Sequence, residues 1–198
     1  MKKIMFNDKY GLTRAVLECR KTQTRRLVPL RTFDISLAHA DRSKAAIMES
    51  IKNNSTYKVG DEVAVAQAYK DIPSIADINY AGVDWDRASK NKPFGRWGCA
   101  NKLPGWSNKM FVRADLMPHR IKITNIRVER LQDISEEDCL QEGIRTDGYK
   151  QQYYCASGFR YHYSTPREAF AVLIDKTCGK GTWESNPYVF VYDFELIR

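Results

Sequence analysis

The chain has 198 residues, of which 43% are hydrophobic and 28% charged, as in an ordinary globular protein that forms a single domain over 1–198. No apolar run approaches the roughly 18 residues of a membrane span, and the N-terminus lacks the apolar stretch of a secretory signal, so we expect a cytoplasmic protein with no membrane partner. The five cysteines include no C-x-x-C pair and the three histidines are far apart. We therefore expect no disulfide framework, metal site or cofactor.

Positive charge is concentrated at the start of the chain. Nine cations and two acidic residues occupy the first 31 positions, so this segment contributes +7 to the total formal charge of +8. Such a concentration would attract phosphate or nucleic acid if it folded onto one face. The alternative is an ordinary surface of solvated lysines and arginines.

The first third of the chain predicts two helices separated by an extended segment. Residues 7–20 have Asn7 as a potential cap and a short apolar stripe, which indicates a helix. The following "QTRRLVPL" is extended in character and ends at Pro29, and 34–51 indicates a second helix. Lys21 would then lie at the exit of the first helix and Thr24 on the turn or strand after it.

The next part of the chain combines a strand with a long irregular segment. In "YKVGDEVAVAQAYKDI" (57–72) large residues alternate with alanines after a Gly-Asp turn, which predicts a strand packed closely on one face. Residues 71–108 hold three of the four tryptophans with little periodicity, and we expect an insertion or functional loop. Its aromatic side chains, Trp97 and Trp106 among them, either pack into the core or offer stacking platforms for bases.

The second half of the chain shows clear signals for strands and capped helices. Strands are expected at 108–114, at 119–134 and at 186–197. In the second of them the apolar positions change from odd to even near Asn125, which predicts a β-bulge. Helices are expected at 135–143 and 165–179, each with a capping residue at its start and a glycine at its end.

The strands with short helices between them predict a β-rich α+β domain built around a small barrel or a strongly curved sheet.

Two features of the sequence suggest a functional site rather than structure alone. In "RKTQTRR" (20–26), Lys21, Thr24 and Arg26 can converge only if the chain turns between Lys21 and Thr24, and they could then hold a phosphate or an oxyanion. Glu142 lies in the last turn of a short helix, where the helix dipole disfavours an anion and a nearby cation such as Lys21 would offset the cost. The alternative is a solvated glutamate.

Four blocks of sequence resemble proteins of the ASCH-domain family, in particular its bacterial and phage-type branch with a K-T-x-T-R-R segment. These blocks are "ECRKTQTRR", "YKVGDEVAV", "RVERLQDISEEDCLQEGI" and "WESNPYVFVYDFELI", in that order along the chain. Cys19 stands where the family commonly has glycine, and 71–108 and 146–164 look lineage-specific. The resemblance implies a PUA-like β-barrel with flanking short helices and a Trp-rich insertion.

The resemblance also implies two functions. The superfamily is generally thought to bind RNA, which makes RNA or a modified nucleoside the expected partner in a basic cleft, with Arg20, Arg25, Arg26, Trp97 and Trp106 as candidate contacts. Some small members are amidohydrolases that cleave the amide of N4-acetylcytidine. Carried onto this chain, their catalytic positions are Lys21, Thr24 and Glu142, with Arg26 as the supporting cation.

Binding is the first expectation from the sequence and hydrolysis the second. In the hydrolase hypothesis Thr24 is the nucleophile and Lys21 its base, and Lys21 must be partly neutral near pH 7. A protein-interaction module that uses exposed aromatics is a third hypothesis, and it leaves the basic cluster unexplained.

Overall fold

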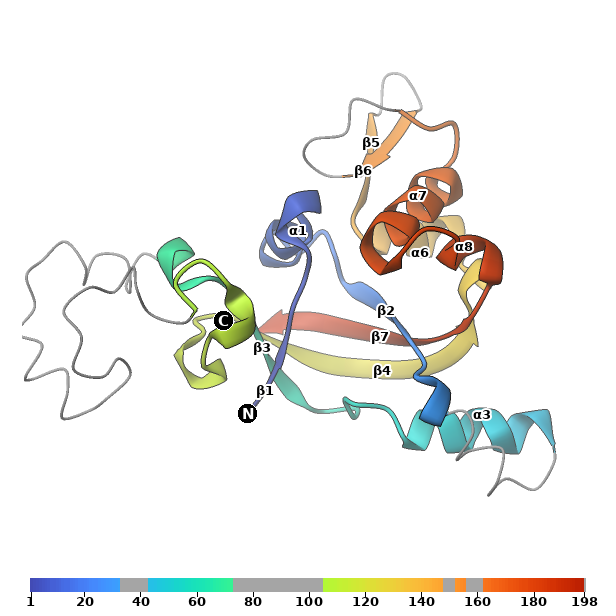
Figure 1. The fold of residues 1–198 in the computed structure, drawn as a ribbon, viewed down its shortest axis with the longest axis horizontal. Coiled ribbons are helices and arrows are strands. Elements are labelled where there is room, and N and C mark those ends of the chain that lie inside the picture. Colours follow the sequence, from blue (N-terminus) through green and yellow to red (C-terminus); the bar gives the residue numbers. More distant parts are fainter. Residues whose placement is uncertain (33–42, 73–104, 148–151, 156–161, 198) are drawn as a thin grey trace, which may run out of the picture. The chain divides into compact units, whose positions relative to one another are not determined.

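The computed structural model describes residues 1–32, 43–72, 105–147, 152–155 and 162–197 (Figure 1). Most of the expected insertion at 71–108 lies outside the described residues. The chain divides into two compact units. The first comprises Met1–Phe6, Glu62–Ile121 and Ile197–Arg198, and the second comprises Asn7–Asp61 and Lys122–Leu196. The architecture is α+β, as the sequence predicts.

Five strands form a mixed sheet. They are β1 (Lys2–Ile4), β2 (Gln23–Leu27), β3 (Glu62–Val65), β4 (Arg120–Arg130) and β7 (Tyr188–Ile197). Their order is β1-β3-β4-β7-β2, with β1 parallel to β3 and β2 antiparallel to β7. Since β1 and β2 are the two edges and do not pair, the sheet is open in the described part of the chain, and no closed barrel is formed there.

In the first unit, β3 is buried on both faces rather than on one. Val63, Ala64, Val65 and Ala66 are all inaccessible to solvent. The strand ends at Val65, short of the predicted continuation to Tyr69, because the chain turns into a 3-10 helix at Tyr69–Asp71. Buried side chains in and beyond the last part of the strand form an apolar cluster: Ala64, Ala66, Tyr69, Ile72, Val112 and Met117.

The strand predicted at 108–114 is wrong. The chain forms two 3-10 helices instead, at Lys109–Phe111 and Ala114–Leu116. The Asn108 side chain accepts a hydrogen bond from the Met110 backbone N–H at 3.0 Å, a local bond that competes with sheet pairing. The Tyr69 hydroxyl accepts a bond from the Arg113 N–H at 2.9 Å.

Within the described part of the chain, the α-helices belong to the second unit, which also contains a small hairpin. The helices are α1 (Leu12–Leu17), α3 (Lys44–Asn53), α6 (Glu136–Gln141), α7 (Pro166–Cys178) and α8 (Thr182–Ser185). The hairpin pairs β5 (Ile144–Asp147) with β6 (Gln152–Cys155). The part of the expected helix before residue 43 lies outside the described residues.

The capping signals are confirmed in detail. Ser135 accepts the Asp138 N–H at the start of α6, and Thr165 accepts the Glu168 N–H at the start of α7, both at 3.1 Å. The Glu168 carboxylate returns to the Ser164 N–H. These bonds satisfy backbone donors that a helix N-terminus leaves without partners, so the short α6 begins at a defined place.

The helix predicted at 7–20 is shorter than expected. Asn7 caps only a 3-10 turn at Asp8–Tyr10, and α1 begins at Leu12. Gly11 separates the two because its φ of 64° is left-handed and stops a continuous right-handed helix.

The change of face in β4 is confirmed. Ile121 and Ile123 are buried and Lys122 is exposed, whereas beyond Asn125 the buried position is Ile126. The strand remains continuous through this change. The buried positions are therefore odd-numbered in the first half of the strand and even-numbered in the second half, which carries charged side chains.

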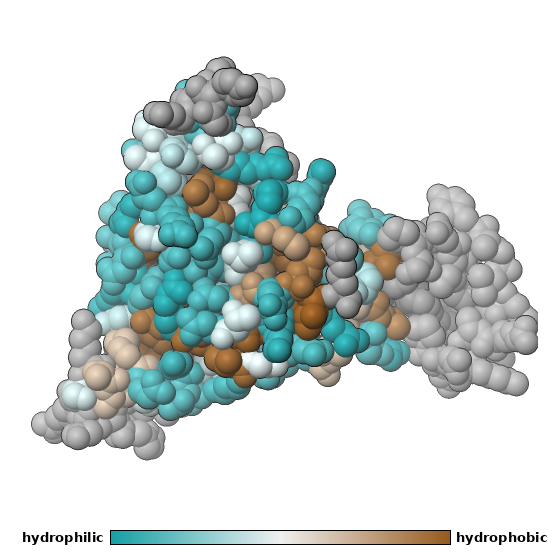
Figure 2. All heavy atoms as spheres, turned by 180° about the vertical axis from the view of Figure 1, so that it is seen from behind, coloured by the Kyte–Doolittle hydropathy of each residue, from teal (hydrophilic) through white to brown (hydrophobic). Residues whose placement is uncertain are grey.

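The core of the second unit draws buried side chains from its strands and from α1, α3, α6 and α7. Figure 1 shows α7 and α8 beside each other on one side of the β4–β7 pair, and Leu131, Ile134, Phe170 and Leu173 are buried there. On the face shown in Figure 2, apolar side chains are interspersed with hydrophilic ones. Among the described residues, no helix is long and apolar enough to cross a membrane.

Cys19 directly follows α1 with a left-handed φ of 57° and is exposed. A non-glycine residue in this conformation is strained by about 1–2 kcal/mol, while glycine adds roughly 0.5–1 kcal/mol of backbone entropy to the unfolded chain. We therefore expect Cys19→Gly to raise the free energy of unfolding by about 0.5–1 kcal/mol in urea denaturation. Cys19→Ala is the control, since it removes the thiol and keeps the strain. Equal stability of the two variants would contradict the explanation.

Candidate functional site

The exit of α1 is tied to two other elements, which fixes where Lys21 lies. The backbone N–H groups of Arg20 and Lys21 both donate to the Ala15 carbonyl, at 2.9 and 3.0 Å. One residue later, the Thr22 N–H donates to the Gln141 carbonyl at 3.0 Å, and the Phe194 N–H donates to the Thr22 carbonyl at 2.8 Å. The turn between α1 and β2 is therefore held by the end of α6 and by β7.

The end of α6 approaches this turn through a glycine. Glu142 is the C-terminal cap of the helix, and Gly143 follows with a left-handed φ of 104°. A Cβ at Gly143 would lie 3.5 Å from Leu12 Cδ2 and 3.7 Å from the Cβ atoms of Ala15 and Lys21. Gly143 thus ends the helix through a backbone conformation that other residues rarely adopt, while a Cβ there would make only ordinary contacts with α1 and Lys21.

Lys21 and Glu142 form a buried ion pair, as the sequence suggests. The Lys21 Nζ donates to Glu142 Oε2 and, at 2.8 Å, to the Glu142 backbone carbonyl. The two side chains are 2% and 6% exposed. The ammonium therefore meets both the carboxylate and the partial negative charge of a helix C-terminus, which together offset its loss of water.

The pKa of Lys21 lies below its ordinary value. Burial lowers it, the charge and hydrogen bond of Glu142 oppose that shift, and the charges of Arg26 and Arg25 lower it further. The direction is the one that a general base needs, because a lysine with a lower pKa is neutral in a larger fraction of molecules near neutral pH.

Arg25 binds the other oxygen of the same carboxylate. Its Nη1 lies 3.3 Å from Glu142 Oε1 and 2.5 Å from Gln23 Oε1. Its Nη2 lies 2.6 Å from Glu129 Oε1 and 2.8 Å from Asp138 Oδ2. Burial lowers the pKa of Arg25, but the surrounding carboxylates more than reverse the shift, so it stays charged.

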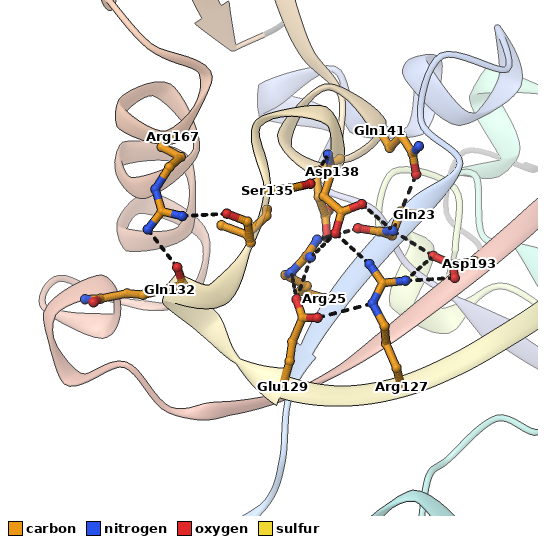
Figure 3. Close-up of polar contacts among 12 residues, drawn as sticks. Gln23, Arg25, Arg127, Glu129, Gln132, Ser135, Asp138, Gln141, Arg167 and Asp193 are labelled. Atoms are coloured by element: carbon orange, nitrogen blue, oxygen red, sulfur yellow. Dashed lines mark hydrogen bonds and ion pairs between the residues drawn. The ribbon is translucent and has the colours of Figure 1, made fainter.

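A second arginine extends this network toward solvent (Figure 3). Arg127 contacts Asp193 at 2.9 Å, Asp138 at 2.6 Å and Glu129 at 3.2 Å, and its side chain is 34% exposed. Gln23 donates to Asp193 at 2.7 Å and to Asp138 at 3.2 Å. Burial raises the pKa of Asp138, but hydrogen bonding and charge from Arg25 and Arg127 bring it below the ordinary value.

Thr24 and Arg26 lie on the other face of β2, since side chains alternate along a strand. Thr24 pairs with Tyr192 of β7 and is 4% exposed, and Tyr57 packs edge-to-face on Tyr192 at 5.2 Å between ring centres. Arg26 is exposed. No hydrogen bond joins the Thr24 hydroxyl to Lys21 within the described chain, so the structure brings together Lys21 and Glu142 but does not bond Thr24 to them.

The remaining candidates lie apart from the pair. Arg20 is bound by Glu18 through two hydrogen bonds, at 2.9 and 2.6 Å. Trp106 is partly buried against the apolar cluster of the first unit, which is the packing alternative considered from sequence. Trp97 lies outside the described residues.

Sequence reasoning missed four residues of the network: Glu129, Arg127, Asp138 and Asp193. The sequence contains one signal for Arg127 and Glu129 and another for Asp193. Arg127 and Glu129 are spaced i, i+2 on a strand, which places both on one face. Asp193 lies inside the largely apolar "YVFVYDFELI", in which Glu195 is the other acid, and a charge in such a strand is expected to have a partner.

No group of histidine, cysteine or acidic residues that could hold a metal ion occurs in the described part of the chain. The sequence matches no protein-family model, and neither a curated protein nor a solved structure matches it.

We expect Lys21→Met to destabilise the protein by about 3–5 kcal/mol, because it leaves the Glu142 carboxylate buried with only the longer Arg25 contact. Adding Glu142→Gln removes the uncompensated charge and should restore a large part of that loss. Urea denaturation of both single variants and the double variant measures the coupling. Additive losses would contradict a buried pair.

Proposed function

We propose that this chain is an ASCH-type protein with a PUA-like fold that hydrolyses an acyl amide on a nucleoside, such as N4-acetylcytidine. The resemblance of the four sequence blocks supplies the family and the substrate class. The observation that carries the activity is the buried contact between Lys21 and Glu142, together with the lowered pKa of Lys21.

Burial argues against the simplest binding hypothesis, in which Lys21 and the arginines contact phosphates. Lys21 is 2% exposed and paired with Glu142. Arg25 is 6% exposed and held by three carboxylates. A phosphate would have to displace these carboxylates, whereas a proton-transfer role needs a desolvated amine beside an acid.

The proposed reaction has two steps. The Thr24 Oγ attacks the acyl carbon, its proton passes to neutral Lys21 Nζ, and the C–N bond breaks as that proton is delivered to the leaving amino nitrogen. Water then attacks the acyl ester on Thr24, which releases the carboxylic acid and restores the hydroxyl. Glu142 orients Lys21, and Arg26, on the Thr24 face of β2, stabilises the oxyanion.

We expect the purified protein to hydrolyse N4-acetylcytidine to cytidine and acetate. Thr24→Val, Lys21→Met and Glu142→Gln should each lower kcat by at least about 10²-fold, since each removes a group that acts in proton transfer or attack. Product formation followed by chromatography measures this.

Thr22→Val is the matched control. It changes the same residue type two positions earlier, where the backbone rather than the side chain makes the bonds described above. Circular dichroism and urea denaturation establish that each variant is folded. Turnover by folded Thr24→Val at the wild-type rate would exclude Thr24 as nucleophile, and absence of turnover by the wild type on a panel of N-acylated nucleosides would exclude the proposal.

RNA binding is the second candidate, and the specific observation in its favour is the concentration of positive charge in the first 31 residues. Among these cations, Lys2, Lys9, Arg14, Arg26 and Arg31 are exposed. Binding through them would be electrostatic and would weaken steeply with salt.

If RNA binds, we expect Arg26→Gln to weaken binding of a single-stranded oligonucleotide and to reduce the slope of log K against log[salt] by about 0.7, the value for one lost contact to a single strand. Arg127→Gln, which removes a partly exposed arginine engaged by carboxylates, is the control. Fluorescence anisotropy across a salt series measures both. Affinity that does not change with salt would contradict this candidate.

A further inference from the structure

We propose that Arg25 is a positioning residue for the Lys21–Glu142 pair. It fixes the Glu142 carboxylate by binding the oxygen that Lys21 does not use, and it favours the neutral form of Lys21. Its catalytic consequence rests on the proposed function, but its effect on Lys21 does not.

The two cations divide one carboxylate between them. Lys21 binds Oε2 and the backbone carbonyl of Glu142, while Arg25 Nη1 faces Oε1 at 3.3 Å. With both oxygens and the carbonyl engaged, rotation of the carboxylate would break at least one charge-assisted bond. The carboxylate is thereby held in a single orientation toward Lys21.

Arg25 is itself held from three elements, which is what a positioning residue requires. Gln23 is on its own strand β2, Glu129 is on β4 and Asp138 is on α6. The Phe170 ring of α7 lies 5.9 Å from its guanidinium carbon. A planar fork with several donors can satisfy all these acceptors at once, whereas a lysine ammonium cannot match their spread.

Charged groups of the neighbouring elements lie around the pair, and several of them are connected to it only through Arg25 and its network. Those of β2 are Arg25 and Arg26; those of β4 are Arg127 and Glu129; α6 contributes Asp138, and β7 contributes Asp193. Burial raises the pKa of the α6 thiol Cys139 to about 12, so it is neutral. Arg167 of α7 is directed to the carbonyls of Gln132 and Ile134, and on the α1 side Arg20 and Glu18 pair with each other.

The sign of the Arg25 effect follows from this arrangement. Its positive charge disfavours a second positive charge on Lys21, and its bond to Oε1 draws part of the Glu142 charge away from Lys21. Both effects lower the pKa of Lys21. Removal of Arg25 therefore raises that pKa, and the carboxylates that it leaves without a partner act in the same direction.

The experiment measures the pKa of Lys21 directly, by NMR of protein labelled with [ε-¹³C]lysine. Lys21→Met identifies the resonance. Arg25→Gln should raise the pKa, and Arg25→Lys, which keeps the charge, should raise it less. The control is Arg127→Gln, which removes an arginine of the same network that makes no contact with Glu142, and the Lys21 pKa should stay unchanged.

Folding is handled by a charge-matched variant. Arg25→Gln with Glu129→Gln removes one positive and one negative charge, so fewer unpaired carboxylates remain, and it should still show an upward shift, smaller than that of Arg25→Gln alone. An unchanged Lys21 pKa in the folded Arg25 variants would overturn the proposal. So would a rise in Arg127→Gln as large as that in Arg25→Gln.

Activity provides the second readout. If the protein hydrolyses N4-acetylcytidine, the acidic limb of the kcat–pH profile should move to higher pH in Arg25→Gln by the same amount as the Lys21 pKa. Absence of hydrolysis in the wild type would remove the proposed function and leave the NMR result as the test of Arg25. A pKa shift without movement of the active enzyme's profile would overturn the positioning role in catalysis.

Discussion

The removal of the Lys21 ammonium from water is the constraint on which the second unit depends. Transfer of such a group to the interior costs several kcal/mol unless charge and hydrogen bonds replace its hydration. Glu142 provides both through its carboxylate and its carbonyl. That arrangement in turn requires the end of α6 to lie against the exit of α1, and Gly143 ends the helix there with a left-handed φ of 104°. The helix α6 is short, but the ion pair stabilises its C-terminal end.

The same constraint changes the meaning of the basic segment "RKTQTRR". As a sequence, its four cations suggest a strip that faces phosphate. In the structure they divide into three roles: Lys21 and Arg25 are buried against carboxylates, Arg20 is paired with Glu18 on the surface, and Arg26 is exposed. The net charge does not reveal this division, because it does not show which cations form ion pairs with acids from distant parts of the chain. The acids concerned lie between residues 129 and 142, more than 100 positions away.

Local chemistry explains why some of the fold was predictable. Helix starts at Ser135 and Thr165 depend on hydrogen bonds within a few residues, so their signals are complete in the sequence. The Lys21–Glu142 pair could be predicted for a similar reason, since the helix dipole disfavours an acid at a helix C-terminus and a nearby cation offsets that cost. The strand expected at 108–114 failed because the Asn108 side chain closes a local turn. The contacts of Arg25 could not be predicted because they come from β4 and α6, which are distant in the sequence and which no local pattern brings to β2.

The two halves of the candidate site differ in how firmly they are held. Lys21 and Glu142 are fixed by each other, by Arg25 and by the backbone bonds of the turn, whereas the Thr24 hydroxyl has no bond to them in the described chain. In a ligand-free enzyme, catalytic hydrogen bonds are often loose and tighten only when substrate is present. A substrate carbonyl beside Thr24 would connect the two halves, because attack of the hydroxyl oxygen on that carbonyl drives transfer of the hydroxyl proton to the Lys21 amine. In the proposed hydrolysis, the desolvated pair is thus the preorganised half of the site, and alignment of Thr24 with it is the step that substrate binding would complete.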